Sequence, residues 1–400
     1  MKKFNYSTLF NSQLSTKRLN EGKDKRDNMI SYEMNAGEEL LRLGDTLLVK
    51  LPYPCRVLST SCLNGGYQEN LQAVFNHHIP PTKHNPEDFE GGSVEAYLEM
   101  VVVAKLGFSP HNAAGLITAA RMENAALKTA KFKNLEVIAI ATAGIDINGG
   151  RAGDPAFYFE DNNQWIFVGG TINILLFING NLLPQTLVRA LITATEAKSA
   201  ALQELMAPSR YSRGIATGSG TDGIVVVSNT SSPNIFTDAG QHSKLGELIG
   251  ITVKDAVKEA LEKETGLNSS RQRNFLTRLE RYGFKPDDFW QKAPPEEFNL
   301  NQETYHKHLN FLASEDKLVA LTTSLLHLLD EYIWGLLPEN AVILTGQKII
   351  RACLAPTINP EEIQKGKTLE AKDPIKDPIS YIINLFIDEV NKLIQAKANN

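Results

Sequence analysis

Short apolar runs rich in Ile, Val and Ala, separated by glycine-containing turns, most constrain this fold. Such runs are typical of buried β-strands, because β-branched side chains pack well on a pleated sheet. We predict strands at Thr46–Leu51, Arg56–Ser61, Ala73–Ile79, Ala114–Ala119, Glu136–Thr142, Ile172–Ile178 and Ile224–Ser228. Helical patterns occur at Val94–Leu106 and Gln185–Met206. Because strands and helices do not alternate strictly, we expect an α/β fold of the α+β type, with a mixed β-sheet, packed helices and Gly-rich loops.

The chain changes character on both sides of this β-rich region. Residues 1–37 form a polar leader, for which we expect partial disorder or an arm on the surface. Residues 38–265 form the mixed domain. In residues 266–400, apolar stripes predict helices over Lys317–Leu337 and after Asp377, which is placed as an N-cap. We therefore predict a mainly helical C-terminal region.

Composition excludes several classes of protein. The net charge of −5 argues against a nucleic-acid binder, which usually carries an excess of basic residues. The longest apolar runs are much shorter than the roughly 20 residues that cross a membrane. Three cysteines without CxxC spacing predict neither a disulfide framework nor a structural zinc site. We expect a cytoplasmic protein without nucleic-acid or membrane partners, and the sequence leaves a homo-oligomer open.

Three loops rich in glycine and small polar residues carry most of the chemical information. They run over Ser59–Gly66, Thr142–Asp154 and Thr217–Gly223. A single loop of this kind is ordinarily a tight turn. Three of them favour a site in which backbone N–H groups approach a ligand and stabilise an oxyanion. The GxGxxG spacing of the third loop does not indicate a dinucleotide site, because a strand follows it where that motif requires a helix.

Six short motifs occur in one order along the chain. They are Asn76-His77-His78-Ile79-Pro80, Thr142-Ala143-Gly144, Gly170-Thr171-Ile172-Asn173, Thr195-Glu196-Ala197-Lys198, Thr217–Asp222 and His242–Gly250. With them, residues 56–260 resemble the adenosylcobinamide amidohydrolase (CbiZ) family. The resemblance implies hydrolysis of the amide between the aminopropanol arm and the corrin ring. The products would be adenosylcobyric acid and 1-amino-2-propanol, in the salvage of corrinoids such as vitamin B12.

The resemblance leaves two other functions open. A non-catalytic corrinoid-binding protein would hold the same ligand without turnover. An amidase with an altered pocket would act on another amide. In each case the partner is a small molecule, with the corrinoid as substrate or ligand, and we predict no required cofactor. The second loop, with Asp146 and Gly149-Gly150-Arg151, differs from the shorter version that we associate with archaeal members of the family.

Four residues are candidates for the chemistry of amide hydrolysis, which needs a nucleophile and acid/base groups. We place His242 first, because histidine titrates near neutral pH, with helix capping as the alternative. Asp222 is an orienting carboxylate or base, or else a turn-forming residue. Glu247 is an acid or a residue of a solvated helix face, and Thr221 is a possible nucleophile. Gly250 predicts a break in the helix that carries Glu247.

Substrate contacts are predicted from the Gly-rich loops and the family motifs. We expect them at Ser61, Asn64, Gly65, His77, Thr142, Gly144, Asn173, Lys198, Gly218 and Gly220. Lys198 falls in an apolar helical stripe, so we favour a side chain that snorkels outward, with an inward pair to a carboxylate as the alternative. Adjacent His77 and His78 on a strand point to opposite faces and do not easily share one ion. We predict no metal site.

Overall fold

The computed structural model describes residues 30–80, 82–83, 86–156, 170–293, 300–354 and 377–398. The chain divides into two compact units, Met1–Asn268 and Ser269–Asn400. The first is a mixed α/β unit, and the described residues of the second are mainly helical. The predicted fold class is therefore confirmed. Within the described residues, no helix has the length and apolar character needed to cross a membrane.

Two β-sheets form the centre of the first unit. The first sheet has the order β1-β2-β3-β6-β7, with β1 Ile30–Glu33, β2 Glu39–Leu43, β3 Thr46–Lys50, β6 Ala73–His78 and β7 Ala113–Thr118. The second has the order β5-β4-β12-β10-β9-β8, with β4 Cys55–Ser59, β5 Gly66–Glu69, β8 Ala126–Phe132, β9 Leu135–Gly144, β10 Thr171–Ile178 and β12 Gly223–Asn229. A small pair joins β11 Asn181–Leu182 and β13 Ile235–Phe236.

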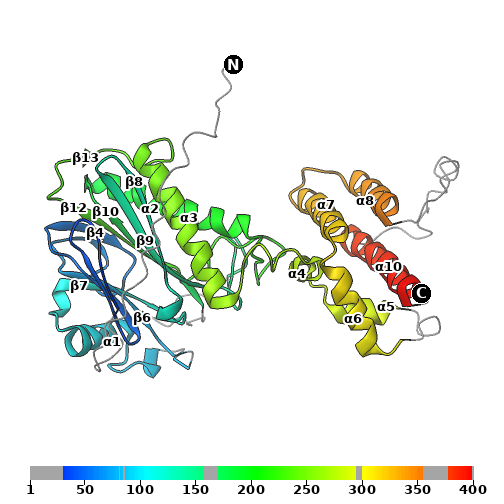
Figure 1. Ribbon diagram of the computed structural model, residues 1–400, viewed down its shortest axis with the longest axis horizontal. Coiled ribbons are helices and arrows are strands. Elements are labelled where there is room, and N and C mark those ends of the chain that lie inside the picture. Colours follow the sequence, from blue (N-terminus) through cyan, green and yellow to red (C-terminus); the bar gives the residue numbers. More distant parts are fainter. Residues whose placement is uncertain are drawn as a thin grey trace, which may run out of the picture. The chain divides into compact units, whose positions relative to one another are not determined.

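Helices cover the outer faces of the two sheets (Figure 1). Helices α2 (Pro184–Glu204) and α3 (Lys244–Thr265) pack on the second sheet, and α1 (Val94–Val101) packs on the first. Along β10, Leu176 faces α2 and α3, whereas Leu175 faces the first sheet. Strands buried on both faces need apolar side chains at every position, which explains the continuous runs in the sequence.

Strand direction brings the Gly-rich loops together. β10 and β12 are parallel, whereas β9 and β4 run antiparallel to them. The carboxyl ends of β4 and β9 therefore lie beside the amino ends of β10 and β12. We call this the loop end of the second sheet, marked by Ser59, Gly144, Thr171 and Gly223. The turn between β8 and β9, at Phe132–Leu135, marks the opposite or far end.

Helix α3 is continuous from Lys244 to Thr265, so the predicted break at Gly250 is wrong. Thr252 is buried, and its hydroxyl donates to the Leu248 carbonyl inside the helix. Ser243 provides the N-cap. A glycine such as Gly250 costs a helix interior only about 1 kcal/mol relative to alanine, which the packing of the apolar helix face offsets.

Part of the predicted leader belongs to the sheet. Ile30–Glu33 forms β1 and pairs antiparallel with β2, and Met34 is buried. Residues 1–29 lie outside the described residues. Helix α1 continues into a π-helical turn at Val102–Leu106, so the helix predicted over Val94–Leu106 is confirmed with a wider last turn. Short 3-10 helices occur at Pro86–Asp88, Pro110–Asn112, Met122–Asn124 and Glu280–Tyr282.

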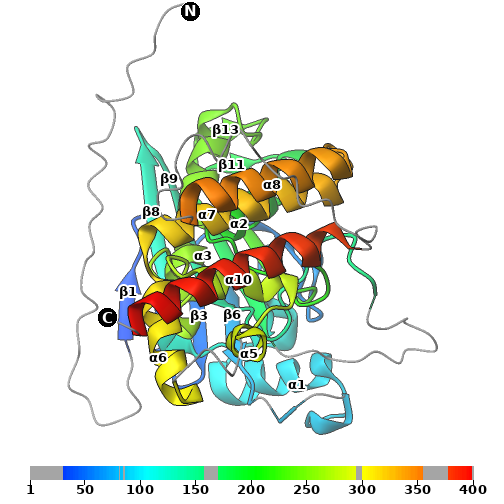
Figure 2. The same ribbon diagram turned by 90° about the vertical axis from the view of Figure 1, so that its right-hand side faces the viewer.

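The second unit is built from α4 Phe275–Leu279, α5 Pro286–Lys292, α6 Gln302–Ala313, α7 Asp316–Ile333, α8 Glu339–Leu354 and α10 Pro378–Ala398. Figure 2 shows α8 and α10 side by side, in agreement with their contacts. Asp377 accepts a hydrogen bond from the Ile379 amide at 3.1 Å, which confirms the predicted cap. In the core, Arg281 donates to Asp330 through both terminal nitrogens, at 2.8 and 2.6 Å.

Candidate active site

A pocket of about 210 Å³ lies at the loop end. Both sheets, the third Gly-rich loop and the start of α1 contribute to its wall. The lining residues are Thr60, Ser61, Cys62, Val94, Gly115, Leu116, Ile117, Asn173, Thr221, Asp222 and Gly223. Four of the predicted site residues, Ser61, Asn173, Thr221 and Asp222, therefore share one cavity.

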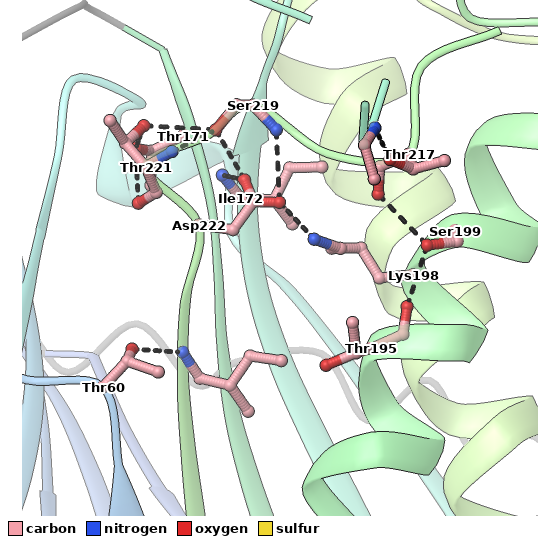
Figure 3. Close-up of polar contacts among 12 residues, drawn as sticks. Thr60, Thr171, Ile172, Thr195, Lys198, Ser199, Thr217, Ser219, Thr221 and Asp222 are labelled. Carbon is pink, nitrogen blue, oxygen red and sulfur yellow. Dashed lines mark hydrogen bonds and ion pairs between the residues drawn. The ribbon is translucent and has the colours of Figure 1, made fainter. Parts of the chain in front are cut away.

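A buried ion pair lies beside this pocket (Figure 3). Lys198 of α2 points inward and donates to Asp222, and their side chains are only 8% and 11% exposed. The expectation that Lys198 snorkels outward is wrong, and the alternative of an inward pair is confirmed. A Cβ at Gly218 would lie 2.3 Å from Asp222 Oδ2 and 2.7 Å from Lys198 Nζ. Glycine at this position thus leaves room for the pair.

Asp222 is held by four donors. Its Oδ1 accepts from the Ile172 amide at 3.0 Å and from the Ser219 hydroxyl at 2.6 Å. Its Oδ2 accepts from the Ser219 amide at 3.2 Å and from Lys198. A carboxylate offers about four lone-pair sites, so the surrounding protein groups use its acceptor capacity. The arrangement joins α2, β10 and the third loop through one side chain.

A cluster of hydroxyl groups connects the pocket wall to this carboxylate. Thr221 Oγ1 lies 2.6 Å from the Gly170 carbonyl oxygen, 2.5 Å from Thr171 Oγ1 and 3.1 Å from Ser219 Oγ. Thr221 donates to the Gly170 carbonyl and Ser219 donates to Asp222, so a rotation of the Thr221 hydroxyl toward Ser219 would complete a chain of hydrogen bonds from Thr221 to the carboxylate (Figure 3). Ser219 is absent from the predicted site. Its position three residues before an Asp in a Gly-rich turn is the sequence signal that could have identified it.

A second polar chain lies behind Asn173. Its side-chain amide donates to Asn76 Oδ1 at 2.7 Å and to the Ile117 carbonyl at 2.8 Å. Asn76 in turn donates to Thr142 Oγ1 at 2.8 Å. Thr142 is 1% exposed, so this predicted contact residue lies behind the pocket wall, where it supports Asn76. The carbonyl oxygen of Asn173 faces Gly223, where a Cβ would lie only 2.7 Å away.

The first Gly-rich loop is fixed to the neighbouring strand. Ser61 Oγ lies 2.7 and 2.6 Å from the carbonyl oxygens of Leu63 and Gly115, and both of their amides donate to it. Asn64 donates to two backbone carbonyls, and Gly65 lies against the backbone of Ser61. The Ser61 hydroxyl is thus occupied by the backbone, although the residue borders the pocket. Asn64 and Gly65 shape the loop outside the lining.

Cys62 also borders the pocket, but its thiol is a poor nucleophile. Although the residue is exposed, partial desolvation by the surrounding protein chiefly raises the pKa of the Cys62 thiol, and the charge of Glu95 adds to the rise. The reactive form of cysteine is the thiolate, which a raised pKa disfavours. Among the described residues, no three His, Cys, Asp or Glu side chains are grouped so that they could hold a metal ion. Of the remaining predicted glycines, Gly144 lies against Glu264 of α3, and Gly220 forms a turn with φ 77°.

His77 lies on the side of β6 that faces α1. Its Nδ1 is 2.7 Å from the Thr46 hydroxyl and its Nε2 is 2.8 Å from the Tyr97 hydroxyl. Burial chiefly lowers its pKa, to about 4, and the nearby charge of Lys105 acts in the same direction. Neighbouring side chains on a strand alternate in direction, so Asn76 faces the pocket region and His77 does not. The structure thus does not bring His77 to the pocket.

His242 and Glu247 lie at the far end of the second sheet. The start of α3 is there, because Lys244 Nζ lies 5.0 Å from the centre of the Phe132 ring. The last turn of the helix reaches the loop end, where Glu264 lies beside Gly144. At 1.5 Å per residue, 22 residues span about 33 Å.

His242 and Asp222, both predicted as catalytic residues, therefore lie at opposite ends of the second sheet and do not share one site. His242 is exposed just before the helix, and exposed Glu247 pairs with Lys244 at 2.5 Å. Both placements match the structural alternatives given from the sequence: His242 lies at a helix start, and Glu247 lies on a solvated helix face. The order of motifs along the chain does not reveal which end of a long helix adjoins a site.

Comparison with known proteins identifies the family. The sequence pattern of the family described as adenosylcobinamide amidohydrolase matches residues 30–269. An uncharacterized protein of Methanocaldococcus jannaschii is 37% identical over 235 residues, covering 55% of this chain and 86% of the relative. An adenosylcobinamide amidohydrolase of Methanosarcina mazei is 29% identical over 225 residues, covering 54% of this chain and 94% of that protein.

Two solved structures are more distant neighbours. The PH0078 protein of Pyrococcus horikoshii OT3 has a TM-score of 0.30 and 11% identity, covering 58% of this chain and 82% of that one. An L-aminopeptidase D-Ala-esterase/amidase of Ochrobactrum anthropi has a TM-score of 0.29 and 10% identity, covering 64% and 91%. The sequence match spans well over half of the chain and includes every residue of the pocket, so this chain belongs to the adenosylcobinamide amidohydrolase family.

Proposed function

We propose that this protein hydrolyses the aminopropanol amide of adenosylcobinamide, giving adenosylcobyric acid and 1-amino-2-propanol. Membership of the family supports the class of reaction. The observation that carries the proposal is the loop-end pocket, which has Thr221 and Asn173 in its wall and the Lys198–Asp222 pair beside it. We place the reaction in cytoplasmic corrinoid salvage.

The size of the pocket suggests which part of the substrate enters it. Pockets that enclose drug-sized ligands usually measure about 300–1,000 Å³, which is larger than the volume of about 210 Å³ found here. A corrin ring exceeds this space. We therefore propose that the amide arm enters the pocket while the ring stays at its mouth.

In the proposed reaction, Thr221 Oγ1 attacks the carbonyl carbon of the amide and forms a C–O bond. The Thr221 hydroxyl first turns its proton from the Gly170 carbonyl toward Ser219 Oγ, 3.1 Å away. That proton then passes to Ser219 Oγ as the Ser219 proton passes along its own hydrogen bond to Asp222 Oδ1. The C–N bond then breaks, and the leaving amine takes up the proton by the reverse route. Water hydrolyses the resulting ester, which releases the acid and restores the Thr221 hydroxyl.

Incubation of the full chain with adenosylcobinamide tests the reaction, with both products measured by chromatography. Thr221→Ala is expected to lower kcat at least about 100-fold, because the attacking group is removed. Thr221→Ser should keep measurable turnover. Thr195→Ala is the matched control, because the Thr195 hydroxyl bonds to its own helix at Leu191.

Three results would contradict this scheme in different ways. Tight corrinoid binding without product would favour a non-catalytic binding protein. Release of amine from other amides, but not from adenosylcobinamide, would favour an amidase with a different substrate. Full turnover by Thr221→Ala would exclude Thr221 as the nucleophile and leave the reaction itself in place.

A further inference from the structure

Asn173 presents a fixed chemical face to the pocket. The two ends of an asparagine amide have nearly the same shape, so its neighbours decide whether N–H or C=O faces a ligand. Here the Ile117 carbonyl decides, because a backbone carbonyl can only accept and lies 2.8 Å from Asn173 Nδ2. The Asn173 nitrogen therefore points away from Gly223 and its oxygen points toward that lining residue.

Asn76 completes this arrangement. It accepts the second N–H of Asn173 at 2.7 Å and donates its own amide to Thr142 at 2.8 Å. Both asparagines are almost fully buried, with exposures of 2% and 1%. A buried N–H without a partner costs about 1–3 kcal/mol, so loss of Asn76 would leave Asn173 unpaired or drive it to rotate.

We infer that Asn76 is a positioning residue that, together with the Ile117 carbonyl, holds Asn173 as a hydrogen-bond acceptor, and that the pocket therefore selects substrates with an N–H or O–H donor at this point. The inference rests on the proposed hydrolysis and deepens it. The aminopropanol arm offers two such donors, the N–H of the secondary amide and the hydroxyl of the alcohol. A site built to pair with a substrate donor discriminates strongly against an analogue that lacks it.

Two substrate analogues test the selection without any mutation. One carries an N-methylated amide, and the other carries a propylamine arm without the hydroxyl. We expect kcat/KM to fall about 10- to 100-fold for one of them, since the acceptor would be left unpaired. The affected analogue identifies which donor pairs with Asn173. Values within threefold of adenosylcobinamide for both analogues would overturn the inference.

Variants test the role of Asn76. Asn76→Leu is expected to reduce the discrimination between adenosylcobinamide and the affected analogue at least about fivefold, because one N–H of Asn173 loses its partner and only the Ile117 carbonyl still holds the amide. Asn173→Leu should do the same, and the double variant should lose no more discrimination than Asn173→Leu alone. Asn391→Leu is the matched control, a buried asparagine of the helical unit that pairs with Tyr305 and the Phe289 carbonyl. Equal discrimination in Asn76→Leu and the wild type would overturn its role.

Binding separates this inference from the proposed reaction. If the wild type releases no amine, the dissociation constants of the three corrinoids are compared by calorimetry. Discrimination in binding without turnover would support the acceptor and refute the hydrolysis. Equal affinities, or no binding of any of the three, would overturn the inference itself.

Discussion

The two ends of the second sheet differ in how far their polar side chains are buried. At the loop end, Asp222 and Lys198 are buried and bonded to each other, and backbone amides complete the shell of the carboxylate. At the far end, His242 and Glu247 are exposed to solvent, and Glu247 pairs with another exposed side chain, that of Lys244. Both ends contain residue types that suit acid/base chemistry. In a buried, hydrogen-bonded environment the orientation of such groups is fixed and their electrostatic interactions are strong, whereas solvent screens those interactions.

The sharpest test of this contrast removes one lysine from each end. Lys198→Met leaves the Asp222 carboxylate buried without its counter-charge, and we expect a loss of about 3–5 kcal/mol in unfolding free energy. Lys244→Met removes the exposed pair with Glu247 and a contact with Phe132, so about 1 kcal/mol or less is expected. Hydrogen exchange of the most protected amides of β10 and β12 measures both losses.

A second substitution distinguishes charge from shape in this test. Asp222→Asn in the Lys198→Met background removes the uncompensated charge and should restore part of the lost stability. If Lys198→Met costs no more than Lys244→Met, burial does not distinguish the two ends, and the proposed site loses its physical basis.

The sequence predicted the seven buried strands of the two sheets, because continuous apolar runs and turns are local signals, but it missed β1, β2, β5 and β8, which lack such runs. It also placed Asn173, Thr221 and Asp222 correctly in one region, since each adjoins the loop end of a strand. The direction of Lys198 was not predictable, because it depends on a partner 24 residues away. The sequence of its helix predicts an apolar stripe, but it does not predict that a carboxylate from another segment faces that stripe. Asn76 stands in one of the family motifs but was not among the predicted site residues, because its role depends on contacts across the two sheets.

The acid stability of the protein sharpens the contrast between two histidines. Burial lowers the pKa of His77 to about 4, whereas an unfolded histidine has a pKa near about 6.5. Between pH about 6.5 and about 4, His77 binds a proton in the unfolded chain but not in the folded chain. The unfolding free energy therefore falls as the pH falls through this range. The full effect is roughly 3 kcal/mol. Thermal unfolding between pH 4 and 8 measures it.

His77→Gln should flatten this part of the profile, because glutamine can still bond to Thr46 and Tyr97 without taking up a proton. His242→Gln, at the exposed far end, is the matched histidine-to-glutamine control made outside the contacts with Thr46 and Tyr97. Parallel profiles for the wild type and His77→Gln would mean that other groups cause the acid loss of stability.

The smallest effect on turnover is expected for His242, the residue that the sequence analysis placed first among the catalytic candidates. His242→Ala should change kcat and KM for adenosylcobinamide by less than about twofold, because an exposed side chain at the far end cannot reach a proton in the pocket. A general acid or base must lie within hydrogen-bonding distance of the proton that it moves, or act through one water. Glu247→Gln should likewise change kcat and KM by less than about twofold. A kcat reduced tenfold or more by His242→Ala, with unchanged thermal stability, would show that a second molecule or a movement of the chain brings the far end to the pocket. The contrast between the two ends would then describe only one state of the protein.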